Sequence, residues 1–311
     1  MNLFATVLTY PAPSANYRGE SELNRSVIQK ITDGRFDYPI ISPEAMRNAL
    51  REMLAGKYQL PCNRSRLHDE DQLAVRFADY PDADQFADDF LFGYLVAASG
   101  KDREKIRKEI AEKRSKDAAK AFTFKRDSVL RMNLAKALEP YRFNAVFTQS
   151  PLSAKDSAYK NSDTSALLHR ETAHTAFQFP FALSGEDCKP KPNWVRALLK
   201  AIGELSDVAG NHARSYYEMA PASIVVRLTS QLVAGYQTYG FTLDGKFPEV
   251  IDGILHEPSA DYLGSEFYIG GKIVKDMVPD QAEKLVAQGV TLDRDPRRLL
   301  DAVAVRFLGG A

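Results

Sequence analysis

The stretch ISPEAMRNALREMLAG, residues 41–56, contains the start, the buried side and the end of one helix. Ser42 is placed to accept hydrogen bonds from the exposed N–H groups of the first turn, Pro43 suits the first helical position, and Gly56 suits the end. Apolar side chains that recur at helical spacing and are expected to face the core are Met46, Leu50, Met53 and Leu54. The sequence therefore predicts an amphipathic helix that packs against a core.

The polar side of this helix carries two arginines about one turn apart. Arg47 and Arg51, together with Asn48, are expected on a wetter face than the apolar stripe. Two guanidinium groups at this spacing are suited to clamp a phosphate. A solvated helix face is the alternative interpretation of the same residues.

Segments rich in β-forming residues lie on both sides of the helix. Residues 3–10 predict a first strand, and the prolines that follow it predict a loop that runs to about Arg35. Three later segments predict strands: YRFNAVFTQ at 141–149, TAFQFPFAL at 175–183 and SIVVRL at 223–228. A second amphipathic helix capped by Asn193 and a closing helix near 280–288 complete the pattern.

The order of these elements predicts an α+β fold compatible with a β-α-β-β-α-β sandwich. Residues 57–140 are highly charged and lack strand-like alternation, so they predict a helical insertion. The polar segment 150–171 between two strands predicts a protruding loop or hairpin. A chain of 311 residues with 44% hydrophobic residues can bury one substantial core that carries such excursions.

The total charge of the chain hides a strong local asymmetry. Lys+Arg and Asp+Glu both number 41, a balance that argues against a uniformly basic nucleic-acid-binding protein. Residues 61–100 carry three basic and eight acidic residues, a net charge of −5, whereas 101–136 carry thirteen and six, a net charge of +7. Two interpretations stay open: solvated helix faces, or complementary patches that dock neighbouring copies and line a phosphate track.

Several classes of protein are excluded by missing patterns. No stretch approaches the roughly 18 apolar residues of a membrane span and the N-terminus lacks a secretory signal, so a cytoplasmic protein without membrane contact is predicted. Cys62 and Cys188 have no zinc-ligand spacing. P-loop, GxSxG, kinase and Rossmann signatures are absent, so no cofactor is expected.

One short segment, HRETAH, is a candidate metal site. His169, Glu171 and His174 lie close in sequence, but the histidines are not at the i, i+4 spacing that places two imidazoles on one helix face. We therefore predict no metal and no catalytic residue, and polar contacts at the base of the protrusion for these side chains.

Four segments carry a resemblance to a known family. They are LNRSVIQKI at 23–31, YPIISPEAMRNALRE at 38–52, HRETAHTAFQFPFAL at 169–183 and GNHARSYYEMAPASIVVRL at 210–228. The chain resembles the Cas-seven superfamily, the backbone subunits of type I CRISPR Cascade complexes, and within it the DevR-like group of type I-B systems. The first two segments and the last follow in the family's order and spacing across most of the chain.

The resemblance implies a hand-like subunit with an RNA-recognition-motif-like (ferredoxin-like) palm, helical fingers and a hairpin thumb. The palm would comprise residues 1–56, 141–149 and 177–311, the fingers 57–140 and the thumb 150–176. The implied partners are guide RNA (crRNA), target DNA, further copies of the chain, and the large, small and crRNA-end-capping subunits. A guide varies in sequence but not in backbone, so contacts to phosphate and sugar are expected.

The resemblance also implies which residues contact RNA. The expected RNA-binding residues are Asn24, Arg25, Lys30, Ser42, Arg47, Asn48, Arg51, Leu167, Leu168, His169, His212, Arg214 and Tyr216. The two arginines of the helix would neutralise phosphates, and the thumb residues Leu167, Leu168 and His169 would displace bases.

Backbone subunits of the related type III complexes cut RNA with an aspartate before the first helix, which directs attention to Asp33 and Asp37. The sequence has IISPEA in place of the Gly-Ser-Ser-type helix start of those subunits, so a non-catalytic protein is expected. Two other functions are kept as alternatives: a stand-alone regulator that binds single-stranded nucleic acid, and a metal-dependent RNase centred on the HRETAH segment or Asp37.

Overall fold

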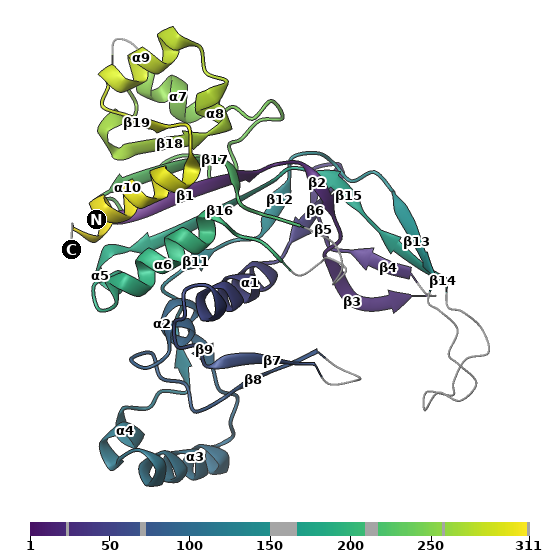
Figure 1. Cartoon of the computed structure of the whole chain (residues 1–311), viewed down its shortest axis with the longest axis vertical. Coiled ribbons are helices and arrows are strands. Elements are labelled where there is room, and N and C mark those ends of the chain that lie inside the picture. Colours follow the sequence, from purple (N-terminus) through teal and green to yellow (C-terminus); the bar gives the residue numbers. More distant parts are fainter. Residues whose placement is uncertain (23–24, 69–72, 150–166, 209–216, 257–258, 310–311) are drawn as a thin grey trace.

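The computed structural model describes the chain except for residues 23–24, 69–72, 150–166, 209–216, 257–258 and 310–311 (Figure 1). Beside the first three of these gaps, the strands are described by their backbone alone. A nine-stranded sheet forms the body, in the order β19-β18-β17-β1-β16-β12-β6-β5, with β11 paired to β16 as well. No helix in the described ranges is both long and apolar enough to cross a membrane.

The centre of the sheet is built from segments far apart in sequence. β1 (Asn2–Thr9) lies between β16 (Phe177–Ser184) and β17 (Pro221–Thr229) and is antiparallel to both. β12 (Ala135–Ala137) is antiparallel to β16 on its other side. Among its elements, the chain has the succession β1, α1 (Pro43–Gly56), β12, β16, α6 (Pro192–Gly203) and β17, with further strands and helices between them. The fold is a mixed α+β fold, as the sequence predicts.

Three helices cover one face of the sheet: α1, α6 (Pro192–Gly203) and α10 (Pro296–Leu308) (Figure 1). The apolar stripe predicted for α1 is confirmed, because Met46, Leu50 and Leu54 are fully buried and Met53 packs against the same core. Each fully buried side chain of this size contributes about 1.5–3 kcal/mol by its removal from water. The small helix α5 (Gly185–Cys188) precedes α6, whose N-cap is Lys191 rather than Asn193.

The C-terminal part of the chain adds a second hydrophobic cluster at one end of the sheet. Its elements are α7 (Pro248–Leu255), η1 (Gly264–Glu266), β18 (Phe267–Gly271), α8 (Lys272–Lys275), α9 (Pro279–Ala287) and β19 (Thr291–Asp293). Phe247, Phe267 and Leu285 are fully buried in this cluster. The closing helix predicted near 280–288 is α9, but α10 follows it.

The excursion after α1 is only partly helical, which corrects the sequence prediction. It contains the helices α2 (Ala87–Phe92), α3 (Gly100–Lys113) and α4 (Lys116–Ala121), and the strand pairs β7 (Arg64–His68) with β8 (Leu73–Phe77) and β9 (Tyr94–Leu95) with β10 (Lys125–Arg126). It ends before residue 131, because β11 (Arg131–Met132) and β12 rejoin the main sheet. We call residues 94–126 the helical lobe, which has a small hydrophobic cluster of its own around Ile110 and Phe122.

A four-stranded sheet, which we call the arm, projects from the other side of the molecule (Figure 1). Its strands are β13 (Ala145–Gln149), β14 (Leu167–Glu171), β4 (Arg25–Ile28) and β3 (Tyr17–Glu22), in that order. At the base of the arm, β2 (Ala12–Ser14) pairs with β15 (Ala173–Thr175), and β5 (Lys30–Asp33) and β6 (Phe36–Ile41) form the edge of the main sheet. Two predictions were wrong here. The segment expected to be a loop up to Arg35 contains four strands, and 141–149 contributes its strand to the arm rather than to the main sheet.

Candidate nucleic-acid interface

Four arginines gather where α1, β7 and β11 meet. Arg47 and Arg51 come from α1, Arg64 begins β7 and Arg131 begins β11. Burial and, to a smaller extent, the neighbouring charge of Arg64 lower the pKa of Arg51 to about 10, while Asp88 acts against the shift. Burial also lowers the pKa of Arg47, with Glu44 acting against the shift and Arg131 adding to it. The four guanidinium groups thus place several like charges in one region of the chain.

Arg51 occupies the inner side of this cluster, which corrects its predicted place on a wet face. The residue is 8% exposed, and its Nη1 donates to Oδ1 of Asn48 at 2.7 Å. The guanidinium lies 4.7 Å from the centre of the Phe92 ring and its Nε lies 4.0 Å from Oδ2 of Asp88. The physical reason is that α2 folds over this side of α1. Arg51 therefore supports the cluster from inside.

The accessible part of the cluster consists of Arg47 and Arg131. Arg131 is exposed, and Arg47 is half-buried. Among the described residues, no acceptor lies within hydrogen-bond distance of the buried Nε of Arg47. The solvent-exposed part of a guanidinium group can bind phosphate oxygens with charge-assisted hydrogen bonds. Ser42 caps α1, its Oγ accepting from the N–H of Ala45 at 3.2 Å, and so stands at the positive end of the helix dipole.

A buried carboxylate pair fixes the excursion against this cluster. Asp88 accepts from the backbone N–H groups of Asn63 at 2.7 Å and Arg64 at 3.0 Å. Asp89 accepts from the Asn63 side chain at 2.9 Å and from the N–H of Asp82 at 2.9 Å. Burial raises the pKa of the Asp89 carboxyl. These contacts determine where Arg64 lies relative to α1.

The sequence analysis did not single out Arg64 or Arg131 as binding residues. They lie 13 and 80 positions beyond Arg51 in the chain, in short strands. The available signal was the excess of basic residues at 101–136, which includes Arg131. No local pattern indicates that β11 passes beside α1, because that contact depends on the pairing of β11 with β16.

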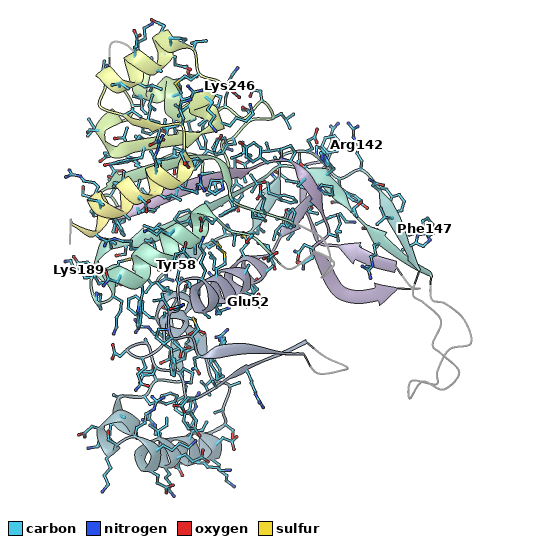
Figure 2. The ribbon with its side chains drawn as sticks, viewed as in Figure 1. Glu52, Tyr58, Arg142, Phe147, Lys189 and Lys246 are labelled. Carbon is cyan, nitrogen blue, oxygen red and sulfur yellow. The ribbon has the colours of Figure 1, made fainter. Side chains whose placement is uncertain are left out.

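The arm carries exposed aromatic and basic side chains. Phe147 on β13 is 63% exposed and faces His169 on β14, with 4.0 Å between the ring centres. Phe143, just before β13, is 64% exposed. Figure 2 shows Phe147 on the arm and Arg142 near its base. Exposed aromatic rings with neighbouring cations are typical of surfaces on which nucleobases stack.

Lys30 lies at the base of the arm in an internal ion pair. Its ammonium is 3.2 Å from Oε2 of the fully buried Glu171 and 4.1 Å from the centre of the Tyr141 ring. Glu171 also accepts from the N–H of Ile28 at 3.3 Å, so it joins β14 to β4 and β5. Lys30 thus holds the arm in place, which differs from the free phosphate contact that the sequence predicted.

Other predicted RNA-binding residues lie outside the described residues or are described only by their backbone. Asn24, His212, Arg214 and Tyr216 fall in the ranges that the structure does not describe. Arg25 lies in β4 and Leu167 and Leu168 lie in β14, each with its backbone described. Their RNA contacts stay predictions.

The residues considered for metal binding or catalysis are distributed over different elements. His169 lies in the arm, His174 is exposed on β15, and Glu171 holds Lys30. Across the described ranges, no three His, Cys, Asp or Glu side chains are grouped to hold a metal ion. Asp33 pairs with Lys136, and Asp37 accepts from the Thr32 hydroxyl at 2.8 Å.

Known proteins resemble this chain in sequence along most of its length and in fold. A protein of Myxococcus xanthus (strain DK1622), the CRISPR-associated protein Cas7/Cst2/DevR, is 28% identical over 295 residues, which cover 92% of this chain and 91% of that protein. A solved chain of a CRISPR RNA-guided surveillance complex aligns with a TM-score of 0.56 at 12% identity, covering 98% of this chain and 99% of its own length. A chain of such a complex described as pre-nicking has the same score and identity, with 99% and 100% coverage. No family model matches the chain.

The fold is thus the mixed α+β fold found in chains of CRISPR RNA-guided surveillance complexes. Along nearly the whole sequence, the chain is similar to the Cas7/Cst2/DevR protein of Myxococcus xanthus.

Proposed function

We propose that this chain is a non-catalytic backbone subunit of a type I CRISPR Cascade complex, of subtype I-B, that binds the phosphate backbone of guide RNA. The observation that carries the proposal is the gathering of Arg64 and Arg131 beside Arg47 and Arg51, which lie in the middle of α1. Arginine recognises phosphate through several donors held in one plane and does not read the base. Such a site suits a guide whose sequence differs from one spacer to the next.

In this proposal the parts of the fold have separate tasks. The main sheet with α1, α6 and α10 is the RNA-recognition-motif-like palm, the excursion that contains the helical lobe is the fingers, and the arm is the thumb. Arg47 and Arg131 contact phosphate while Arg51 supports them from inside. Phe147 and His169 offer rings on which a displaced base stacks. The undescribed residues named above, together with Arg25, Leu167 and Leu168, remain part of the proposed RNA surface.

Several copies are proposed to bind one guide side by side and to present it to target DNA, together with the large, small and crRNA-end-capping subunits. A head-to-tail contact between identical chains that does not close into a ring produces a helical filament. Antiviral defence would then follow from pairing between guide and target, with the protein holding the backbone.

The test is the mass of the protein purified with guide RNAs of two spacer lengths. The number of copies per RNA is expected to increase with spacer length. A constant single copy would contradict the filament and favour a stand-alone regulator that binds single-stranded nucleic acid. Cleavage of the bound RNA that requires a metal ion would contradict the non-catalytic assignment.

Substitution of the two accessible arginines tests the phosphate site. Arg47→Ala and Arg131→Ala are each expected to weaken RNA binding to a similar extent for all sequences and to reduce the dependence of log Kd on log salt by about 0.7–1 per arginine. Filter binding at several salt concentrations, with two unrelated RNA sequences, measures both effects. Lys189→Ala, at an exposed lysine on the far side of the core near α5, is the matched control. A loss confined to one RNA sequence would contradict backbone recognition.

A further inference from the structure

The acidic and basic stretches noted in the sequence partly neutralise each other within one molecule. Arg114 of the basic stretch donates to Asp79 and Asp82 of the acidic stretch, each at 2.8 Å. Asp88 and Asp89 of the acidic stretch are buried. The described acidic residues are therefore largely used inside the chain, and they do not form a surface for a neighbouring copy.

The helical lobe keeps an excess of positive charge. Residues 94–126 contain eleven basic and five acidic residues, a net charge of +6. Its exposed lysines are Lys101, Lys105, Lys108, Lys113, Lys116, Lys120 and Lys125. Leu95 of the lobe is 66% exposed and lies directly opposite Lys125 in the β9–β10 ladder. The lobe thus presents an apolar side chain beside an exposed cation.

A surface of the opposite character is lined by the end of β1 and by Lys272 of α8, which are not part of the helical lobe. It is a pocket of about 340 Å³ with Leu8, Leu138 and Ala176 among its apolar lining. Its acidic residues are Glu139, Asp244 and Asp276. We call it the acidic pocket.

The charges of the acidic pocket are only partly compensated within the chain. Lys272 pairs with Asp276, and Lys246 pairs with Asp244 at 2.8 Å. Glu139 is exposed at the rim. Leu243, at the tip of the turn that forms one wall, is 71% exposed. The pocket therefore combines an apolar interior with net negative charge.

We propose that the acidic pocket of one copy receives Leu95 and Lys125 of the helical lobe of the next copy. The helical lobe is chosen as the partner of the pocket because their charges are complementary. The lobe has an exposed leucine next to excess positive charge, and the pocket has an apolar interior next to uncompensated negative charge. This contact joins two different surfaces at separate places on the chain, which is the head-to-tail type of contact that a filament requires. It rests on the proposed function, since it supplies the lateral contact between copies on one guide.

The contact is tested by exchanging the two charges. Lys125→Glu alone and Glu139→Lys alone place like charges against each other, so each is expected to raise the protein concentration that half-fills a long RNA by about tenfold or more. The variant with both substitutions restores opposite charges at every contact and is expected to fill the RNA as the unaltered chain does. Lys189→Glu, which makes the same charge change elsewhere, is expected to have no effect.

Two RNAs and a sample without RNA separate this contact from RNA binding. Mass photometry on a short RNA that accepts one copy is expected to give the same Kd for all four variants, and sedimentation at high protein concentration reports self-association directly.

Weakened binding of Lys125→Glu to the short RNA would assign the lobe to nucleic acid and overturn the contact. Single variants that fill the long RNA normally, or a double variant that does not recover, would also overturn it. Failure of the unaltered chain to bind the short RNA would instead count against the proposed function, with sedimentation still testing the contact.

Discussion

Replacing Asp88 with alanine is expected to lower the free energy of unfolding by about 3–5 kcal/mol, because it leaves a buried charge and two buried N–H groups without their partner. The Asp88 carboxylate is fully buried, accepts from the N–H groups of Asn63 and Arg64, and lies 4.0 Å from Nε of Arg51. Urea unfolding followed by circular dichroism measures the loss. Because the same contacts place Arg64 beside α1, RNA binding is expected to weaken even at temperatures where the variant stays folded.

Two further variants separate the charge of Asp88 from its hydrogen bonds. Asp84→Ala removes an exposed carboxylate from the same segment, whose side chain is 93% exposed, and is expected to leave the unfolding midpoint unchanged. Asp88→Asn keeps one acceptor oxygen and should lose less stability than alanine does. Equal stability of Asp88→Ala and Asp84→Ala would show that the buried carboxylate does not hold the excursion on α1.

Local signals in the sequence were sufficient for the helix at 42–56. Ser42 caps it as predicted, and the helix interior repeats apolar residues at a period that only one face can bury. The first strand and the late strand at 223–228 could be predicted equally well, since long runs of β-forming residues are typical of strands that are buried in a sheet. These elements can be predicted from the sequence because the patterns of burial and capping involve residues only a few positions apart.

The arm could not be predicted in the same way. β3 and β4 contain charged and polar residues, and what makes them strands is their pairing with each other and with β14, more than 140 positions away. A strand stabilised by such pairing has no period that separates it from a loop. The same reason explains why 57–140 looked helical throughout: β7 and β8 form a hairpin, and β11 and β12 are too short to show alternation.

In the candidate site, too, some features follow from residues close together in sequence and others from residues far apart. The arginines of α1 were found from their spacing, but their exposure depends on α2, which covers Arg51 with Phe92 and leaves Arg47 half-exposed. The family resemblance placed Lys30 among the RNA-binding residues, and the fold adds what no local pattern indicates, its ion pair with Glu171 of β14. Residue type predicts the chemistry that a side chain can perform, and only the fold determines which partner it meets.

Replacing Phe147 with alanine is expected to weaken RNA binding by about 1–3 kcal/mol for each stacked base, or roughly 5- to 150-fold in Kd. The ring is 63% exposed and contacts His169 edge to face, so its loss removes a stacking surface and takes little from the core. The stability of the variant and the salt dependence of its binding should both stay unchanged, which distinguishes this effect from that of the arginines. Phe147→Trp keeps a stacking ring and should retain affinity. Val146→Ala, at the adjacent residue that is 49% exposed, is the control for the strand. Equal affinity of Phe147→Ala and Val146→Ala for RNA would contradict a base-stacking role, and it would leave the arginine cluster as the principal contact with the guide.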